Sequence, residues 1–148
     1  MGPDHEAAMT TAPVEVQDWT KEAKSFKPSM TADVQTAPEI ALESVATGLA
    51  AQGFRIKDRT PTGFRASHRQ LVSGILGLVT GNDADILDRT LLAVEASPTA
   101  AGTRLTISVA GGGEHRAGRT RGRAGLTTGL QELQRRGVAV TTTAWQRP

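Results

Sequence analysis

The chain has 148 residues, of which 38% are hydrophobic and 3% aromatic. This length and composition suit a single domain with one aliphatic core. The chain has no cysteine, which excludes disulfides, thiolate nucleophiles and cysteine-ligated zinc. Residues 1–50 hold eight acidic side chains and three lysines, a net charge of −5, whereas residues 51–148 hold seven acidic and fourteen basic side chains, a net charge of +7. A basic body behind an acidic arm favours polyanionic partners such as anionic lipid or nucleic acid, or contact between the two parts; the alternative is an arginine-rich face that meets only solvent.

Residues 1–27 are rich in Ala, Thr, Pro and Glu and contain few large apolar side chains. Such a segment cannot offset the entropy cost of ordering by burial in a core. We therefore predict a flexible acidic arm over residues 1–27, with Trp19 as the side chain able to dock on the body, and a single domain over residues 28–148. The arm lacks the basic start and apolar run of a secretory signal, so we expect a cytoplasmic protein.

A short strand is predicted over residues 29–34, followed by the first helix. Residues 36–39 (Thr-Ala-Pro-Glu) match a capping box, in which the Thr hydroxyl and the Glu carboxylate each satisfy a free amide at the helix start. Gly53 offers a left-handed exit from the helix. The helical repeat of apolar residues consists of Leu42, Val45, Ala46 and Leu49. These features predict an amphipathic helix of about four turns.

Beyond Gly53 the apolar period changes from helical spacing to two, which is typical of strands with one wet face. Residues 54–57 and 64–69 alternate in this way around a Thr-Pro-Thr-Gly turn at residues 60–63. Residues 86–96 and 105–110 alternate similarly around a second turn. The sequence therefore predicts two hairpins.

Residues 71–80 (LVSGILGLVT) join the two predicted hairpins and form the most apolar stretch of the chain. They fall well short of the roughly 20 apolar residues of a membrane-spanning helix, yet a connection normally runs over wet surface. Three interpretations stay open: the segment folds into the core, inserts shallowly into a membrane or covers a ligand, or pairs with a second protomer as a homo-oligomer. The candidate apolar contacts are Leu71, Ile75, Leu76 and Leu78.

Four arginines between His115 and the last helix form a second candidate feature. Arginine binds phosphate through two parallel hydrogen bonds, and the amides at the start of a following helix also favour anions. An exposed basic loop without a ligand is the alternative. The candidate anion-binding residues are Arg116, Arg119, Arg121 and Arg123.

The last predicted helix contains Leu126, Leu130 and Leu133 at helical spacing and ends at Gly137. Four glycines precede or enter it and would form a smooth helical strip that either packs against the sheet or leaves residues 111–124 mobile. Residues 138–143 are rich in β-branched side chains and would either add an edge strand or form an irregular tail. The glycines are Gly118, Gly122, Gly125 and Gly129.

The predicted class is α+β, with the order β-α-β-β-β-β-α and an antiparallel sheet of four to six strands. Each helix has only one apolar stripe, so both must share the apolar side of the sheet. This order of elements over residues 28–137 loosely resembles the TBP-like and helix-grip groups of α+β folds. The resemblance lies in element order alone and assigns no functional residue.

No catalytic or metal-binding constellation is recognisable, so we expect a protein that is not an enzyme and holds no cofactor. His68 lies on the apolar face of a predicted strand, where a hydrogen-bonded histidine of the core or its rim is expected instead of an acid or base paired with a carboxylate in a pocket.

Our leading hypothesis is a non-catalytic module that meets an anionic ligand or membrane surface peripherally, through the apolar segment and the four arginines. The first alternative is a carrier of a small apolar molecule, with a closed pocket. The second is nucleic-acid binding through the arginines, which the low aromatic content disfavours for single strands. The pocket of the first alternative would be lined by Phe54, Phe64, Leu92 and Ile107.

Overall fold

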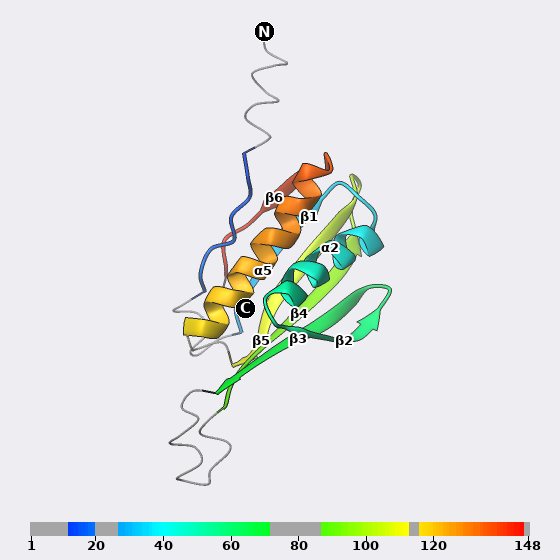
Figure 1. The fold of residues 1–148 in the computed structure, drawn as a ribbon. Helices are drawn as coiled ribbons and strands as arrows, with labels where there is room; N and C mark the ends of the chain where they lie inside the picture. Colours follow the sequence, from blue (N-terminus) through cyan, green and yellow to red (C-terminus); the bar gives the residue numbers. More distant parts are fainter. Residues whose placement is uncertain (1–11, 20–26, 72–86, 113–115, 147–148) are drawn as a thin grey trace, which may run out of the picture.

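The computed structural model describes residues 12–19, 27–71, 87–112 and 116–146. Within these residues an antiparallel sheet of six strands carries two helices on one face (Figure 1). The elements, in chain order, are β1 (Ser29–Val34), α2 (Pro38–Ala51), β2 (Arg55–Thr60), β3 (Gly63–Leu71), β4 (Leu87–Pro98), β5 (Thr103–Gly112), α5 (Arg116–Arg135) and β6 (Val140–Thr142). The predicted α+β class and the predicted order of elements are confirmed.

The strands lie in the order β2-β3-β4-β5-β1-β6. The two predicted hairpins, β2-β3 and β4-β5, pair with each other through β3 and β4, and β1 inserts between β5 and β6. Burial alternates along β1 and β5, because every second side chain points to the helices. β6 is the edge strand expected from the β-branched tail.

The hydrophobic core lies between the sheet and the two helices. Aliphatic side chains supply most of it, as the composition requires, and each helix buries one stripe. The helical part of the core consists of Leu42, Val45 and Leu49 from α2 and Leu126, Leu130 and Leu133 from α5.

The two helices cross at backbone distance because glycine occupies the contact on both. A Cβ atom built on Gly48 would lie within 2.8 Å of the amide nitrogen of Gly129 and closer still to the carbonyl oxygen of Gly125. The Ser44 hydroxyl donates a hydrogen bond of 2.6 Å to the Gly129 carbonyl across this contact. The glycine strip of α5 therefore packs against α2 at Gly125 and Gly129, whereas we expected it either to pack against the sheet or to leave residues 111–124 mobile.

The predicted start of the first helix is wrong in detail, whereas both predicted helix ends are correct. The N-cap of α2 is Ala37 and makes no side-chain capping bond. The Thr36 carbonyl instead accepts a hydrogen bond from the Thr103 hydroxyl, which ties the residue to β5. Gly53 and Gly137 have φ angles of +92° and +88°, the left-handed conformation expected of glycine after a helix.

Residues 12–19 differ from the predicted flexible arm. They run as an extended segment beside α5 (Figure 1) and insert Val16 and Trp19 into the core, with exposures of 1% and 0%. The docking of Trp19 is confirmed, and its ring meets that of Trp145 edge to face at 4.9 Å. The rest of the predicted arm before residue 12, and residues 20–26, lie outside the described part of the chain.

Side chains of α5 hold this segment through its backbone, which composition alone does not reveal. The Gln134 amide accepts from the Val14 amide at 2.8 Å and donates to the Ala12 carbonyl at 3.0 Å. Gln131 donates to the Val14 carbonyl at 3.0 Å. The ordering entropy is thus offset by fixed polar partners as well as by two buried anchors.

Candidate functional site

The predicted basic loop is the beginning of α5. The helix starts at Arg116, so the four arginines lie in its first two turns and do not precede it as we expected. Helix continues through two glycines of this stretch because Gly118 and Gly122 are buried. A Cβ atom on Gly122 would lie 2.8 Å from the Trp19 ring, so close packing stabilises the turn that glycine propensity disfavours.

Two of the four arginines hold the segment of residues 12–19. The Arg119 side chain is only 13% exposed and its Nε lies 3.3 Å from Oδ1 of Asp18. Arg123 donates from Nε to the Val16 carbonyl at 2.6 Å. Both contacts are made through the Nε of the guanidinium group.

Arg116 and Arg121 are exposed and form no ion pair with a described residue. Among the four predicted arginines, Arg119 and Arg123 thus contact residues 12–19, while Arg116, Arg121 and Arg123 are exposed.

The predicted apolar contact lies mostly outside the described residues. Leu71 is the last residue of β3, and its backbone partner is Leu87, the first residue of β4. Ile75, Leu76 and Leu78 belong to residues 72–86, which the structure does not describe. Because Leu71 and Leu87 are partners, the connection leaves and re-enters the sheet at one point. We call this end of the molecule the connection end.

Basic side chains surround the point at which the connection leaves the sheet. Arg69 and Arg89 are exposed and lie directly opposite each other, two residues from Leu71 and Leu87. α5 also begins at the connection end (Figure 1), which brings Arg116 and Arg121 to the same part of the molecule. Among the described residues, no helix has the length and apolarity needed to cross a bilayer.

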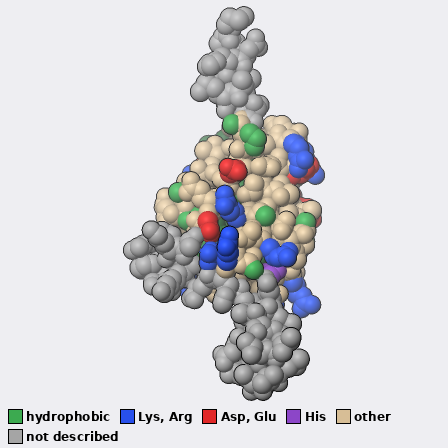
Figure 2. All heavy atoms as spheres, turned by 60° about the vertical axis from the view of Figure 1, so that its left-hand side comes forward, with side chains coloured by type: hydrophobic (Ala, Val, Ile, Leu, Met, Phe, Trp, Pro, Cys, Tyr) green, Lys and Arg blue, Asp and Glu red, His purple; other side chains and the backbone are tan. Residues whose placement is uncertain are grey.

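The surface between residues 12–19 and α5 carries mixed charge. Figure 2 shows basic side chains gathered near the centre of this side of the molecule beside acidic ones, with hydrophobic side chains in small separate areas. Ile40 of α2 is the one large hydrophobic side chain among the described residues that is exposed, at 44%. The described surface therefore offers no broad apolar patch.

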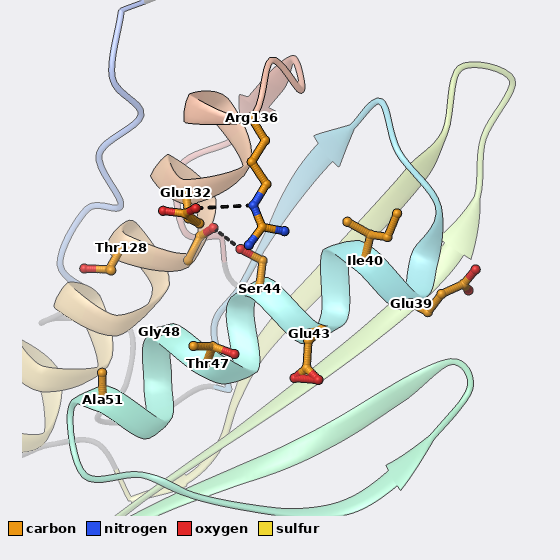
Figure 3. Close-up of a pocket in the computed structure, with 11 residues that line it drawn as sticks. Glu39, Ile40, Glu43, Ser44, Thr47, Gly48, Ala51, Thr128, Glu132 and Arg136 are labelled. Carbon is orange, nitrogen blue, oxygen red and sulfur yellow. Dashed lines mark hydrogen bonds and ion pairs between the residues drawn. The ribbon is translucent and has the colours of Figure 1, made fainter.

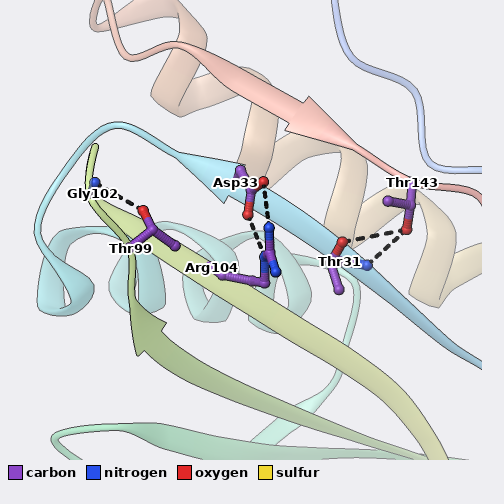
Figure 4. A network of polar contacts seen from close by, with 6 residues as sticks. All are labelled: Thr31, Asp33, Thr99, Gly102, Arg104 and Thr143. Atoms are coloured by element: carbon purple, nitrogen blue, oxygen red, sulfur yellow. Dashed lines mark hydrogen bonds and ion pairs between the residues drawn. The ribbon is translucent and has the colours of Figure 1, made fainter.

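The opposite end of the sheet carries paired charge. Arg104 of β5 donates to both carboxylate oxygens of Asp33 in β1, at 2.8 and 3.1 Å (Figure 4). These hydrogen bonds, and to a lesser degree the positive charge, hold the pKa of Asp33 below its usual value although partial burial opposes the shift. The same pair raises the pKa of Arg104. Both side chains are about half exposed, so the pair is well hydrated.

A groove of about 570 Å³ lies between the outer surfaces of α2 and α5 (Figure 3). Its floor is formed by Ser44, Gly48 and Gly129, where the helices touch. Of the charged residues that line it, Glu132 pairs with Arg136 at 3.2 Å and Glu43 pairs with Arg59 at 3.5 Å. Sequence reasoning missed this groove, although Gly48 opposite a row of glycines was the signal that could have revealed it.

His68 lies in the core, as expected from its place on an apolar strand face. It is 7% exposed and its ring lies 5.1 Å from that of Phe54. Acid or base chemistry in a pocket finds no support in this position.

The four residues expected to line a ligand cavity also belong to the core. Phe54, Phe64, Leu92 and Ile107 are at most 4% exposed and lie in one cluster with the helical leucines. None of them lines the groove between the helices. No protein-family model matches the chain, and no curated protein is significantly similar to it.

Proposed function

We propose that the protein is a non-catalytic module that attaches peripherally to anionic membranes through its connection end. The observation that carries this proposal is the placement of Arg69 and Arg89 opposite each other at the point where the most apolar segment of the chain leaves and re-enters the sheet. An apolar segment flanked by cations matches the two parts of a bilayer surface, its acyl layer and its phosphate layer.

The first turns of α5 add two cations at the connection end, on the helix side of the sheet. Arg116 and Arg121 lie at the connection end, are exposed, and have no ion-pair partner among the described residues. Cations near an anionic leaflet contribute on the order of 1 kcal/mol each. In this proposal Ile75, Leu76 and Leu78 supply the apolar contact and the arginines supply the electrostatic attraction.

The other hypotheses find less support in the described contacts. A carrier needs a cavity, whereas the four residues that would line it are packed in the core. Nucleic-acid binding gains nothing from an apolar segment beside the cations. Pairing of residues 71–80 with a second copy remains a competing prediction, and it is distinguished by measuring the mass of the protein in solution.

Sedimentation with vesicles tests the proposal. We expect binding to vesicles containing phosphatidylserine, weak binding to phosphatidylcholine alone, and a fall in affinity as salt is raised. Replacing Ile75 and Leu76 with Ser should reduce binding at least tenfold, since each loses several buried methylene or methyl groups. Ile40→Ser is the matched control because Ile40 is exposed in the groove between α2 and α5. Absence of wild-type binding to both kinds of vesicle would refute the proposal.

A further inference from the structure

Five cations gather on the outer face of the sheet, opposite the helices. They come from three neighbouring strands, β2, β3 and β4, and all five are exposed. We call this set the basic sheet face. Its members are Arg55, Lys57, Arg65, Arg69 and Arg89.

The strand register places these side chains on one surface. Arg55 lies opposite Ser67 and Lys57 opposite Arg65, while Arg69 lies opposite Arg89. The intervening residues of β3, such as Phe64 and Ala66, are buried under the helices. Since side chains alternate along a strand, the basic residues must point to the other face.

Two of the strand pairings place like charges directly opposite each other. The Cβ atoms of such pairs in antiparallel strands lie about 4.5–5.5 Å apart, where like charges destabilise a sheet. Lys57 faces Arg65, and Arg69 faces Arg89. None of the four forms an ion pair with a described residue. The two pairs therefore bring like charges together on this face, and an anionic partner would offset their mutual repulsion.

A bulge in β2 separates this surface from Arg59, the cation of this strand that forms an ion pair with a described residue. The pairing shifts between Lys57 and Thr60, and Asp58 adopts a φ of +54°. The bulge interrupts the alternation of side chains, and Arg59 pairs with Glu43 of α2 at 3.5 Å. Arg59 is thereby neutralised on the helix side, while Lys57 stays on the basic sheet face.

The surroundings of the cations are shallow and contain no ring. Ser67, Leu91 and Ala93 lie between them in the register, and Leu91 is the largest of these three side chains. The described aromatic residues, Trp19, Phe54, Phe64 and Trp145, are all in the core. Base stacking therefore has no platform on this face, whereas an array of phosphates can lie against it.

We infer that the basic sheet face is the electrostatic docking surface for phosphate groups of an anionic lipid membrane. This inference rests on the proposed function and names the residues that orient the protein on the bilayer. Arg69 and Arg89 belong both to this face and to the root of the apolar connection. That continuity favours a membrane over nucleic acid, since only a membrane has an acyl layer beside its phosphates.

The test compares two double variants with equal loss of charge. Lys57→Gln with Arg65→Gln removes one repelling pair from the basic sheet face, and Arg135→Gln with Arg136→Gln removes two exposed cations from the end of α5. At low ionic strength we expect the first variant to bind phosphatidylserine vesicles about 20- to 30-fold more weakly, since each cation contributes about fivefold. The second variant should change less than threefold.

Thermal unfolding of the same variants distinguishes the loss of a binding contact from the loss of a residue that stabilises the fold. Removal of a repelling pair should raise the melting temperature of the first variant while its binding falls. A third double variant, Arg69→Gln with Arg89→Gln, repeats the test at the other repelling pair if Lys57→Gln with Arg65→Gln does not fold.

The outcomes separate the inference from the proposed function. If the wild type binds and the variants of the basic sheet face bind as tightly as the α5 control, the inference fails and the proposed function stands. If the wild type binds no vesicle, both fail. If the same variants weaken binding to a short DNA duplex while no vesicle binds, the face belongs to a nucleic-acid site and the membrane assignment is overturned.

Discussion

Single side chains show how differently charge is used at the two ends of the sheet. Asp33 and Arg104 lie opposite each other and neutralise one another through two hydrogen bonds. Lys57 and Arg65 occupy an equivalent cross-strand arrangement with equal signs. The first pairing stabilises the sheet and the second opposes it. Stabilisation of the sheet therefore explains why Arg104 lies opposite Asp33, but it does not explain why Lys57 lies opposite Arg65.

The Asp33 carboxylate makes part of the stability depend on pH. Its pKa is lowered in the folded state, so the folded protein holds fewer protons there than the unfolded chain. The contribution is complete above the unfolded pKa of about 3.9 and is lost as pH falls through the lower folded value. We expect Asp33→Asn to lower the urea midpoint at about pH 7 and to match the wild type at about pH 2. An equal difference at both pH values would contradict this role.

At the scale of the elements, the contact between α2 and α5 leaves little space for additional side-chain atoms. Glycine is a poor helix former, yet Gly48, Gly125 and Gly129 all lie inside the two helices. They allow backbone contact and the hydrogen bond from Ser44 to Gly129. The close crossing also brings the leucine stripes of both helices onto the same sheet face.

Gly48→Ala should therefore destabilise the protein although alanine favours helix. The new Cβ would overlap backbone atoms of Gly125 and Gly129, which cannot move like a flexible side chain. We expect a loss of about 1–3 kcal/mol in the free energy of unfolding, measured with urea. Thr47→Ala, at an exposed neighbouring position, should stay within about 0.5 kcal/mol of the wild type. A stable Gly48→Ala protein would mean that the helices do not cross this closely.

For the whole molecule, one core joins parts of the chain that are far apart in sequence. It includes Val16 and Trp19 near the start and Trp145 near the end, together with both helices and the sheet. The Trp145 indole also donates to the Gln17 carbonyl at 2.6 Å. The two segments are therefore expected to unfold together with the rest.

This cooperativity is measurable because both tryptophans of the chain lie in the two terminal segments. Tryptophan fluorescence reports on their contact, while far-ultraviolet circular dichroism reports on the helices and sheet. We expect the two urea transitions to coincide. A fluorescence transition at clearly lower urea would show that residues 12–19 dissociate first.

Most of the fold was accessible from the sequence because it depends on short-range patterns. Alternation along residues 54–69 and the glycines after each helix identified the hairpin and the helix ends. The start of α5 was missed because its glycines are compensated by packing against Trp19, which lies about a hundred residues earlier. The docking of Trp19 was predicted, but the ordering of the residues before it was missed, since their partners on α5 are distant in sequence.

The candidate site was only partly predictable. The arginines of the cluster were found by composition, but the engagement of Arg119 and Arg123 by residues 12–19 depends on tertiary contacts. The alternation of basic residues in residues 54–69 predicted a wet strand face. Only the register between strands shows that Lys57 faces Arg65 and that Arg69 faces Arg89.

The contact between Trp19 and Trp145 has a consequence for biosynthesis. On the ribosome, residues 12–19 emerge early, but the indole that donates to Gln17 is translated 128 residues after its acceptor. The contacts of residues 12–19 with Trp145 can therefore form only after α5 and β6 have been translated. A translation product that stops before Trp145 lacks the ring that covers Trp19, and this leaves a large aromatic surface open to chaperones and proteases.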